Sequence, residues 1–232
     1  MSVDVRPTLA TSRLRPLGTV LVTGGASGLG AATVGAVAEA GGSPVVIDRD
    51  ECDLADTRAA EAAVGAVLET HGAIDALVTC AGIDVPGPFD RVARETWERV
   101  VAVNLLGTVA VVRAALPTLL ERQGRIVTVA STLGHRAVSD ATAYCASKFG
   151  VVGFTRALQA ELKGRVGVTM LTPGGMHTSF FDGRDAQYRP GSDARLCDPR
   201  DVAAAIVFAL ARPDGCEVKE LVVAPPEETS WP

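Results

Sequence analysis

The sequence predicts an α/β protein with a doubly wound parallel sheet in three α/β/α layers and about six to seven strands. Short apolar runs without polar alternation recur along the chain, which is the pattern of strands buried on both faces. Segments with helical spacing separate these runs. The first run, Val20 to Val22, leads into the glycine-rich stretch Thr23 to Gly30. A strand, a glycine-rich turn and a helix in this order are typical of a site that binds phosphate groups.

We expect residues 1–16 to form a loosely ordered N-terminal tail, because they carry Pro, Thr and scattered charges without any period. From Leu17 onward, strand and helix patterns alternate without a linker. Residues 17–232 should therefore form a single domain. With 47% hydrophobic residues, the chain can bury a sizeable core.

The remaining elements follow in order. Helical spacing is expected over 28–41, 55–71, 96–122, 142–162 and 199–211, and strands over 44–48, 75–79, 126–131, 166–171 and 220–223. Residues 179–198 carry no such pattern. A loop of this length is uncommon in a compact domain, so we expect a lid over a small-molecule substrate.

Composition argues against several classes of protein. The net charge of −5 without a basic stripe argues against nucleic acid as a partner. The apolar stretch 100–120 is interrupted by Asn104, Arg113 and Pro117, which favours a buried helix over a membrane span. Five cysteines without a close pair indicate neither a metal site nor a disulfide framework. No export signal is visible. We expect a cytoplasmic protein with free thiols and no bound metal.

Tyr144 and Lys148 are four residues apart in a helical pattern, so both side chains lie on one face. A nearby ammonium stabilises a phenolate, which makes the two residues a candidate acid/base pair. The same spacing also occurs on many solvated helix faces. Ser131, at the end of the apolar run 126–131, adds a hydroxyl to the set.

Taken together, these motifs resemble the short-chain dehydrogenase/reductase family, specifically its compact single-domain branch with a Rossmann-like sheet. The resemblance covers roughly residues 17–223. It depends on five separated motifs: the turn from Thr23 to Gly30, the run Cys80-Ala81-Gly82, Asn104, the set Ser131, Tyr144 and Lys148, and Pro173-Gly174 followed by Thr178. Cys80 departs from the pattern, since relatives usually have Asn there.

The resemblance implies a dinucleotide cofactor. Its expected contacts are Gly24, Ser27, Gly28, Leu29 and Gly30 at the pyrophosphate, Asp48, Asp53, Leu54, Ala81 and Gly82 on the adenosine side, and Tyr144, Lys148, Pro173, Gly174 and Thr178 on the nicotinamide side.

Asp48 favours NAD, because a carboxylate at the end of the second strand binds the ribose hydroxyls and repels the 2′-phosphate of NADP. Arg49 would suit a 2′-phosphate, whereas Ser27 lies where NADP-preferring relatives often carry a basic residue. Burying a carboxylate beside a phosphate costs more than an exposed arginine returns. We expect NAD, with NADP as the less favoured cofactor.

The segment after Asp48 is shorter than in relatives, which place a helix and a third strand before the Asp-hydrophobic pair that contacts adenine. Here Asp53-Leu54 comes five residues after Asp48. A parallel crossover needs roughly ten or more residues. We therefore expect the third strand to be absent or vestigial, and the adenine side to be unusually exposed.

The implied reaction is hydride transfer between NAD(H) and a secondary alcohol or ketone. Tyr144 would be the general acid/base, Ser131 would bind the substrate oxygen, and Asn104 would complete a water relay. Lys148, with the positive nicotinamide ring, would lower the pKa of Tyr144. Two alternatives remain: an NADPH-dependent carbonyl reductase and a non-catalytic dinucleotide sensor.

Substrate and assembly are less defined. Met176, Phe180 and Phe181 suggest an apolar pocket, whereas the lid arginines Arg184, Arg189 and Arg195 would suit a carboxylate or phosphate. The family pairs the two apolar helices around Asn104 and Tyr144 across a two-fold axis, so we expect a homodimer or homotetramer. We expect Trp231 to pack on a neighbouring subunit.

Overall fold

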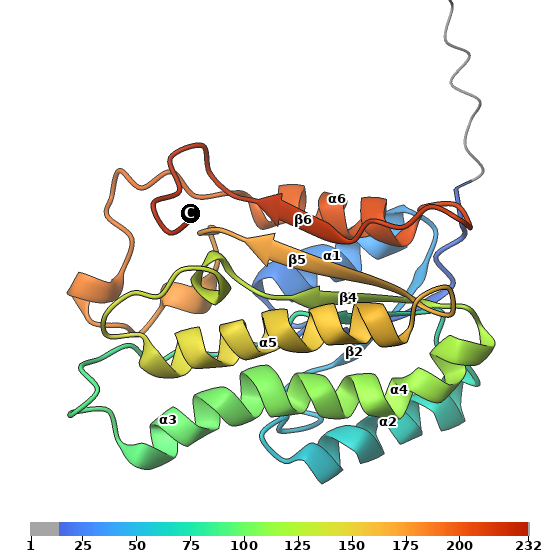
Figure 1. The fold of residues 1–232 in the computed structure, drawn as a ribbon, viewed down its shortest axis with the longest axis horizontal. Helices are drawn as coiled ribbons and strands as arrows, with labels where there is room; N and C mark the ends of the chain where they lie inside the picture. Colours follow the sequence, from blue (N-terminus) through green and yellow to red (C-terminus); the bar gives the residue numbers. More distant parts are fainter. Residues whose placement is uncertain (1–13, 232) are drawn as a thin grey trace, which may run out of the picture.

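The computed structural model describes residues 14–231 and contains a six-stranded, all-parallel sheet in the order β2-β1-β3-β4-β5-β6 (Figure 1). The strands are β1 (Thr19–Thr23), β2 (Ser43–Ile47), β3 (Ala76–Thr79), β4 (Arg125–Val129), β5 (Gly167–Pro173) and β6 (Glu220–Val223). The helices are α1 (Gly28–Glu39), α2 (Thr57–His71), α3 (Arg94–Val101), α4 (Thr108–Glu121), α5 (Thr142–Glu161) and α6 (Pro199–Leu210). The doubly wound α/β prediction is confirmed.

Helices cover both faces of the sheet, which explains the continuous apolar runs of the strands. Leu21 of β1 belongs to the core cluster that includes residues of α2 and α4, whereas its neighbours Val20 and Val22 belong to the cluster that includes residues of α1 and α6. Successive strand residues point to opposite faces, so each strand contributes to both cores. Figure 1 shows α5 and α4 in front of the sheet and α1 behind it.

The predicted N-terminal tail falls largely outside the described residues. Its last residues, 14–16, lie against the fold: the Arg15 backbone N–H donates to the Ala211 carbonyl at 3.1 Å, and its guanidinium donates to the Arg122 carbonyl at 2.9 Å. Arg15 is thus held against the fold, although the sequence placed it in the loosely ordered tail.

The sheet has no strand between β2 and α2, as the short spacing predicted. Residues 48–56 form turns that lead from β2 directly into α2, where the Asp56 carboxylate accepts from the Arg58 and Ala59 backbone N–H groups and caps the helix. Cys52 and Leu54 are buried and fix the segment to the core. As a result β2 is the edge strand on this side, and six strands remain.

The chain order reverses at β1, which lies between β2 and β3. In an open parallel sheet such a reversal leaves a crevice beyond the carboxyl ends of the two flanking strands, and ligands bind there. The fold alone therefore directs attention to the turns that follow β1, β2 and β3.

The predicted helix 96–122 is one continuous run, Arg94–Glu121, whose middle segment Ala102–Gly107 is π-helical and contains Asn104. By length and composition this run would be able to cross a membrane, but half of its most apolar window is buried inside the protein. The buried helix of a core satisfies the same criteria.

Gly107, at the end of the π-helical segment, allows the short segment 48–56 to lie against the helix. A Cβ on Gly107 would come within 2.6 Å of the Leu54 carbonyl oxygen, which belongs to the backbone and has little freedom to move. Gly65 in α2 has no neighbouring atom within 4 Å of the corresponding position.

We predict that Gly107→Ala destabilises the protein by about 1–3 kcal/mol, because overpacking forces the backbone to shift. The matched control Gly65→Ala should stabilise it by about 0.5–1 kcal/mol, the difference in helix propensity. Urea unfolding of both variants measures the effect. Equal stability of the two variants would show that the segment does not need this close approach.

Candidate active site

A cavity of about 880 Å³ opens at the carboxyl ends of the strands, where the fold predicts ligand binding. Its walls come from the turn after β1, the ends of β2 to β5, and the lid segment that follows β5. Figure 1 shows the lid, in orange, at the end of the molecule toward which the strand arrows point.

The glycine-rich turn between β1 and α1 leaves its backbone open to the cavity. Gly24 and Gly28 have φ angles of +72° and +50°, which other residues rarely adopt. A Cβ on Gly30 would overlap the Gly24 carbonyl oxygen. The turn therefore forms a compact cradle at the N-terminus of α1, where free N–H groups and the helix dipole favour a phosphate.

Asp48 connects the end of β2 to this cradle. Its Oδ2 accepts from the Ala26 backbone N–H at 2.8 Å, and its Oδ1 accepts from the Arg49 N–H at 2.7 Å. The carboxylate is thus held at the rim of the cavity, beside the glycine-rich turn.

Asp53 lines the same cavity, but its carboxylate already has partners. The Arg99 guanidinium donates to it twice, at 2.9 and 3.2 Å, and the Ala55 N–H donates at 3.0 Å. The Arg99 hydrogen bonds are the main cause that lowers the pKa of Asp53. An adenine contact through this carboxylate would have to share it with Arg99.

Every predicted cofactor contact lines this single cavity. The set comprises Gly24, Ser27, Gly28, Leu29, Gly30, Asp48, Asp53, Leu54, Ala81, Gly82, Tyr144, Lys148, Pro173, Gly174 and Thr178. Ser131 lines it as well, whereas Asn104 lies behind the wall and is fully buried. Roles for these residues remain predictions.

Tyr144 and Lys148 share one face of α5, as predicted, and both are buried. The Lys148 ammonium lies 5.7 Å from the centroid of the Tyr144 ring and donates to the Val129 carbonyl at 2.9 Å. Val129 is the last residue of β4, so the end of the strand fixes the lysine. Ser131 follows two residues later.

Burial controls the pKa values of this pair. It raises the pKa of Tyr144 to about 12, against the opposing effect of a hydrogen bond from the Ser131 hydroxyl to the tyrosine oxygen. It lowers the pKa of Lys148 to about 8. Without a cofactor, desolvation thus outweighs the groups that lower the pKa of Tyr144, and Lys148 is not among those groups. That Lys148 and a bound nicotinamide together lower this pKa stays a prediction.

Asn104 joins the π-helical segment to two neighbours. Its Nδ2 donates to the Ile83 carbonyl at 2.9 Å and to the Ser147 hydroxyl at 3.0 Å, and its Oδ1 accepts from the Ile83 N–H at 2.8 Å. These bonds fix the loop after β3. At Gly82 a Cβ would lie 3.5 Å from Asn104 Oδ1 and 3.7 Å from Lys148 Nζ, so both polar atoms face the same point beside this glycine.

The lid contains two short 3₁₀ turns, Ser179–Phe181 and Ala186–Tyr188. The two ends of the lid segment are joined by an isolated β-bridge, a backbone pairing of Met176 with Cys197. The Tyr188 hydroxyl donates to Asp140 Oδ2 at 3.0 Å and connects the lid to the loop before α5. Arg184 enters the cavity beside Asp84, a residue of the loop after β3. Sequence reasoning missed Asp84, although it lies only two residues after Gly82.

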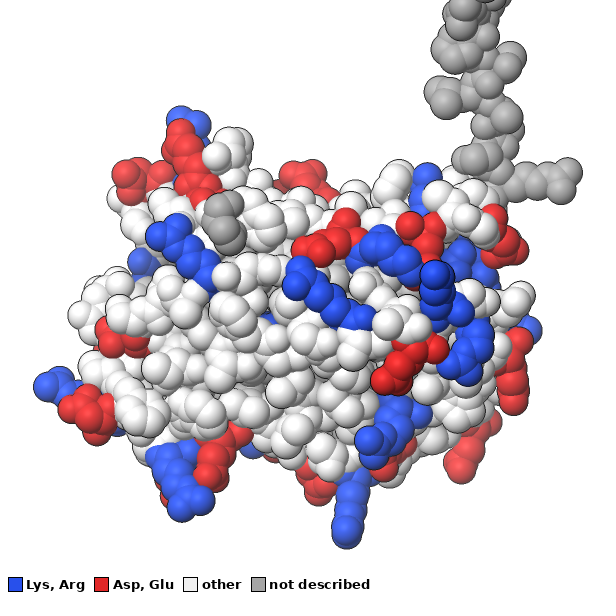
Figure 2. All heavy atoms as spheres, viewed as in Figure 1, with Lys and Arg blue, Asp and Glu red and all other residues white. Residues whose placement is uncertain are grey.

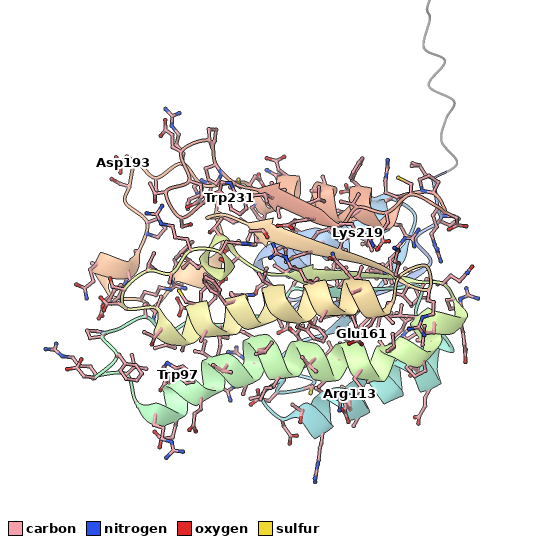
Figure 3. The ribbon with its side chains drawn as sticks, viewed as in Figure 1. Trp97, Arg113, Glu161, Asp193, Lys219 and Trp231 are labelled. Carbon is pink, nitrogen blue, oxygen red and sulfur yellow. The ribbon has the colours of Figure 1, made fainter. Side chains whose placement is uncertain are left out.

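The C-terminal tail also reaches the site, which the sequence did not indicate. Glu228 Oε2 accepts from the Gly175 N–H at 2.9 Å, and Ser230 shares a hydrogen bond of 2.6 Å with Thr132. Trp231 lies in this tail (Figure 3), and its ring packs edge-on against His135 of the same chain at 5.4 Å. Trp231 is still 37% exposed, so its packing on a neighbouring subunit stays a prediction beside this internal contact. The tail has no hydrophobic period that would have revealed this.

Across residues 14–231, no group of three His, Cys, Asp or Glu side chains is arranged to hold a metal ion.

The family model described as short chain dehydrogenase matches residues 18–189. A D-threitol dehydrogenase of Mycolicibacterium smegmatis is 35% identical over 219 residues, covering 81% of this chain and 84% of that protein. A dehydrogenase/reductase SDR family protein 7-like of Anopheles gambiae is 35% identical over 189 residues, covering 77% of this chain and 58% of that longer protein. The chain belongs to the short-chain dehydrogenase/reductase family.

Solved structures agree with this assignment. A 3-ketoacyl-(acyl-carrier-protein) reductase from Brucella melitensis, complexed with NADH, superposes with a TM-score of 0.81 at 29% identity, covering 91% of this chain and 98% of that one. The protein is therefore an oxidoreductase of this family with a dinucleotide-binding, Rossmann-like fold.

We predict that buried Lys148 makes stability rise with pH. Its pKa is about 8 in the folded protein and near 10.5 when exposed, so between these values the unfolded state binds more protons and folding becomes more favourable as pH rises. Urea unfolding at pH 8 and pH 10 should show that wild type gains on the order of 2–3 kcal/mol relative to Lys148→Met.

Lys163 is exposed and offers the matched control, since Lys163→Met should leave the pH dependence of wild type unchanged. A Lys148→Met protein with the same pH dependence as wild type would show that Lys148 is not desolvated.

Proposed function

We propose that the protein transfers a hydride reversibly between NAD(H) and a secondary alcohol or ketone, with Tyr144 as general acid/base. The observation that supports this most strongly is the single cavity that joins the glycine cradle at one end to Tyr144, Ser131 and Lys148 at the other. A dinucleotide has two ends, and the cavity offers a phosphate site and an acid/base site within one volume.

The cradle fits a dinucleotide, because its glycines let the turn pack tightly on itself and on the neighbouring strand ends, and the turn opens to the cavity at the α1 N-terminus. Residues at this cradle would hold the pyrophosphate, and Pro173, Gly174 and Thr178 would border the nicotinamide. When bound, the nicotinamide supplies or accepts the hydride.

At the other end of the cavity, Tyr144 would take the substrate hydroxyl proton in oxidation and return it in reduction. The Ser131 hydroxyl would donate to the substrate oxygen and stabilise its developing charge. Lys148 would bind ribose hydroxyls, and its charge would add to that of the cofactor in stabilising the phenolate. Asn104 would hold a water beside Gly82 and so complete a proton relay that reaches Lys148.

Two features support NAD over NADP. The Asp48 carboxylate is held at the rim of the cavity by the Ala26 and Arg49 N–H groups, where it would meet the ribose hydroxyls. A 2′-phosphate would place like charges together there. Ser27, also at the rim, offers no compensating positive charge. Arg49 lines the cavity too, so an NADPH-dependent carbonyl reductase is the second candidate.

A non-catalytic sensor finds less support, because the complete set of Ser131, Tyr144 and Lys148 lies within the cavity. A binding module needs no buried acid/base pair. Keeping a lysine and a tyrosine desolvated costs stability, which a catalytic role would explain.

We also propose that the chain forms a homodimer or homotetramer through α4 and α5. Leu106 and Phe149 are 48% and 45% exposed on this side. Figure 2 shows that the face over α5 and the adjoining helix carries few charged side chains. An exposed apolar face of this kind marks a contact surface.

Five free cysteines support a reducing, cytoplasmic location.

We predict that wild type binds NADH at least about 10-fold more tightly than NADPH, and that Asp48→Asn removes most of this preference by removing the like-charge repulsion. Fluorescence titration with each reduced cofactor measures both constants. Asp50→Asn makes the same change two residues away at an exposed position, and should leave the preference intact. Tighter binding of NADPH by wild type would favour the carbonyl reductase.

We predict that Tyr144→Phe lowers the turnover of a secondary alcohol by about 10²- to 10⁴-fold while NADH binding is kept, since only the proton transfer is lost. The chain has two tyrosines, so Tyr188→Phe is the matched control. It removes one hydrogen bond between the lid and Asp140 and should change turnover only a few-fold. A Tyr144→Phe enzyme with near-normal turnover would refute the assigned role.

A further inference from the structure

Asp84 and Arg184 bring a buried pair of opposite charges to the wall of the cavity. Their side chains are only 5% and 10% exposed, and Arg184 Nη2 lies 3.3 Å from Asp84 Oδ2. Asp84 comes from the loop after β3, and Arg184 comes from the lid. Nothing in the proposed hydride transfer requires either residue, so the pair calls for its own explanation.

The guanidinium of Arg184 has unused hydrogen-bonding capacity. Its Nε and Nη2 are buried, yet no described residue accepts a hydrogen bond from either atom, and the contact with Asp84 is an ion pair without hydrogen-bond geometry. The ring centroids of Phe180 and Phe181 lie 4.5 and 4.9 Å from the guanidinium carbon of Arg184, and these cation–π contacts fix the group. A buried donor without an acceptor is costly, so a ligand that supplies acceptors would bind favourably.

The pair lies beside the proposed acid/base. Phe180 connects the two, because the centroid of its ring is 5.7 Å from that of Tyr144 and 4.5 Å from the Arg184 guanidinium carbon. The charges of Asp84 and Arg184 also act on Tyr144 in opposite directions, raising and lowering its pKa respectively. A group that occupies the pair would therefore belong to the same small molecule whose hydroxyl meets Tyr144.

The opposite charges of Asp84 and Arg184 limit which functional group of a ligand can bind between them. A carboxylate or phosphate on Arg184 would bring a second negative charge next to buried Asp84, and a cation on Asp84 would repel Arg184. An alkyl group would leave the guanidinium donors unpaired. A hydroxyl both donates and accepts, so it satisfies Asp84 and Arg184 together without adding charge.

We propose that Asp84 and Arg184 form a recognition subsite for the hydroxyl next to the reacting carbon, so that the preferred substrate is a neutral vicinal diol or polyol. This inference depends on the proposed function, since it assigns the substrate class of that same site. For Arg184, a hydroxyl thus replaces the carboxylate or phosphate that we expected from the sequence as the partner of the lid arginines.

The test compares four secondary alcohols of four carbons: 2-butanol, 2,3-butanediol, butane-1,2,3,4-tetrol and 3-hydroxybutanoate. Oxidation rates are measured with wild type, Arg184→Met, Asp84→Asn and the charge-neutral double variant of both. The control Arg195→Met removes an arginine of the same lid that is 73% exposed and pairs with exposed Glu227. Thermal unfolding confirms that each variant folds, and the double variant avoids leaving one buried charge unpaired.

We expect wild type to prefer the diol and tetrol over 2-butanol in kcat/KM by on the order of 10- to 100-fold. In the double variant the kcat/KM values for the diol and tetrol should fall to about that variant's own value for 2-butanol. Arg195→Met should behave as wild type. A wild-type preference for 3-hydroxybutanoate would overturn the proposal in favour of an anionic substrate. Faster oxidation of all four alcohols by Arg184→Met would overturn it in favour of a lid that only blocks the cavity.

A binding measurement separates this inference from the proposed function. Enhancement of NADH fluorescence on mixing with the protein reports the cofactor site, and a further change on adding the tetrol reports the subsite. If NADH does not bind, the proposed function fails. If NADH binds but the tetrol does not, or if it binds equally to wild type and the double variant, the subsite is refuted while the cofactor site stands.

Discussion

The register of the parallel sheet positions the functional groups of the site. Thr23, Thr79 and Thr128 are register partners across β1, β3 and β4, so the turns after these strands begin at one level. One residue beyond Thr128, the Val129 carbonyl holds the Lys148 ammonium. The glycine cradle, the small residues after β3 and the acid/base pair thus meet at one edge, although they are far apart in the sequence. A shift of register in one strand would separate them.

Desolvation is the second constraint on the site. Tyr144, Lys148, Asp84 and Arg184 all have pKa values displaced in the direction that disfavours their charged forms, and burial is the largest cause for each. Such groups weaken the fold, and the apolar packing on both faces of the sheet offsets them. The same low polarity makes each group sensitive to the charge and hydrogen bonding of a bound molecule, which suits a site for proton transfer.

Spacing along the chain predicted much of the architecture. Asp53 follows Asp48 by only five residues, too few for a crossover, and the strand that relatives have between them is indeed missing. The apolar runs gave the remaining strands within a residue or two, and the long apolar stretch around Asn104 is one helical run, Arg94–Glu121, as its period indicated. These predictions succeeded because chain length and local period limit what a backbone can do.

Other features had no local signal. Asp84, Glu228 and Trp231 look like ordinary loop or tail residues, and each acquires its role from a partner more than fifty residues away: Arg184, Gly175 and His135. The raised pKa of Tyr144 was missed for the same reason, because desolvation depends on the whole surrounding structure. The sequence by itself determined the fold, the glycine cradle and the order of the candidate acid/base residues, since these follow from period, glycine placement and spacing. The tertiary structure alone decided which charges are buried together beside them, because burial and pairing arise only where distant segments pack.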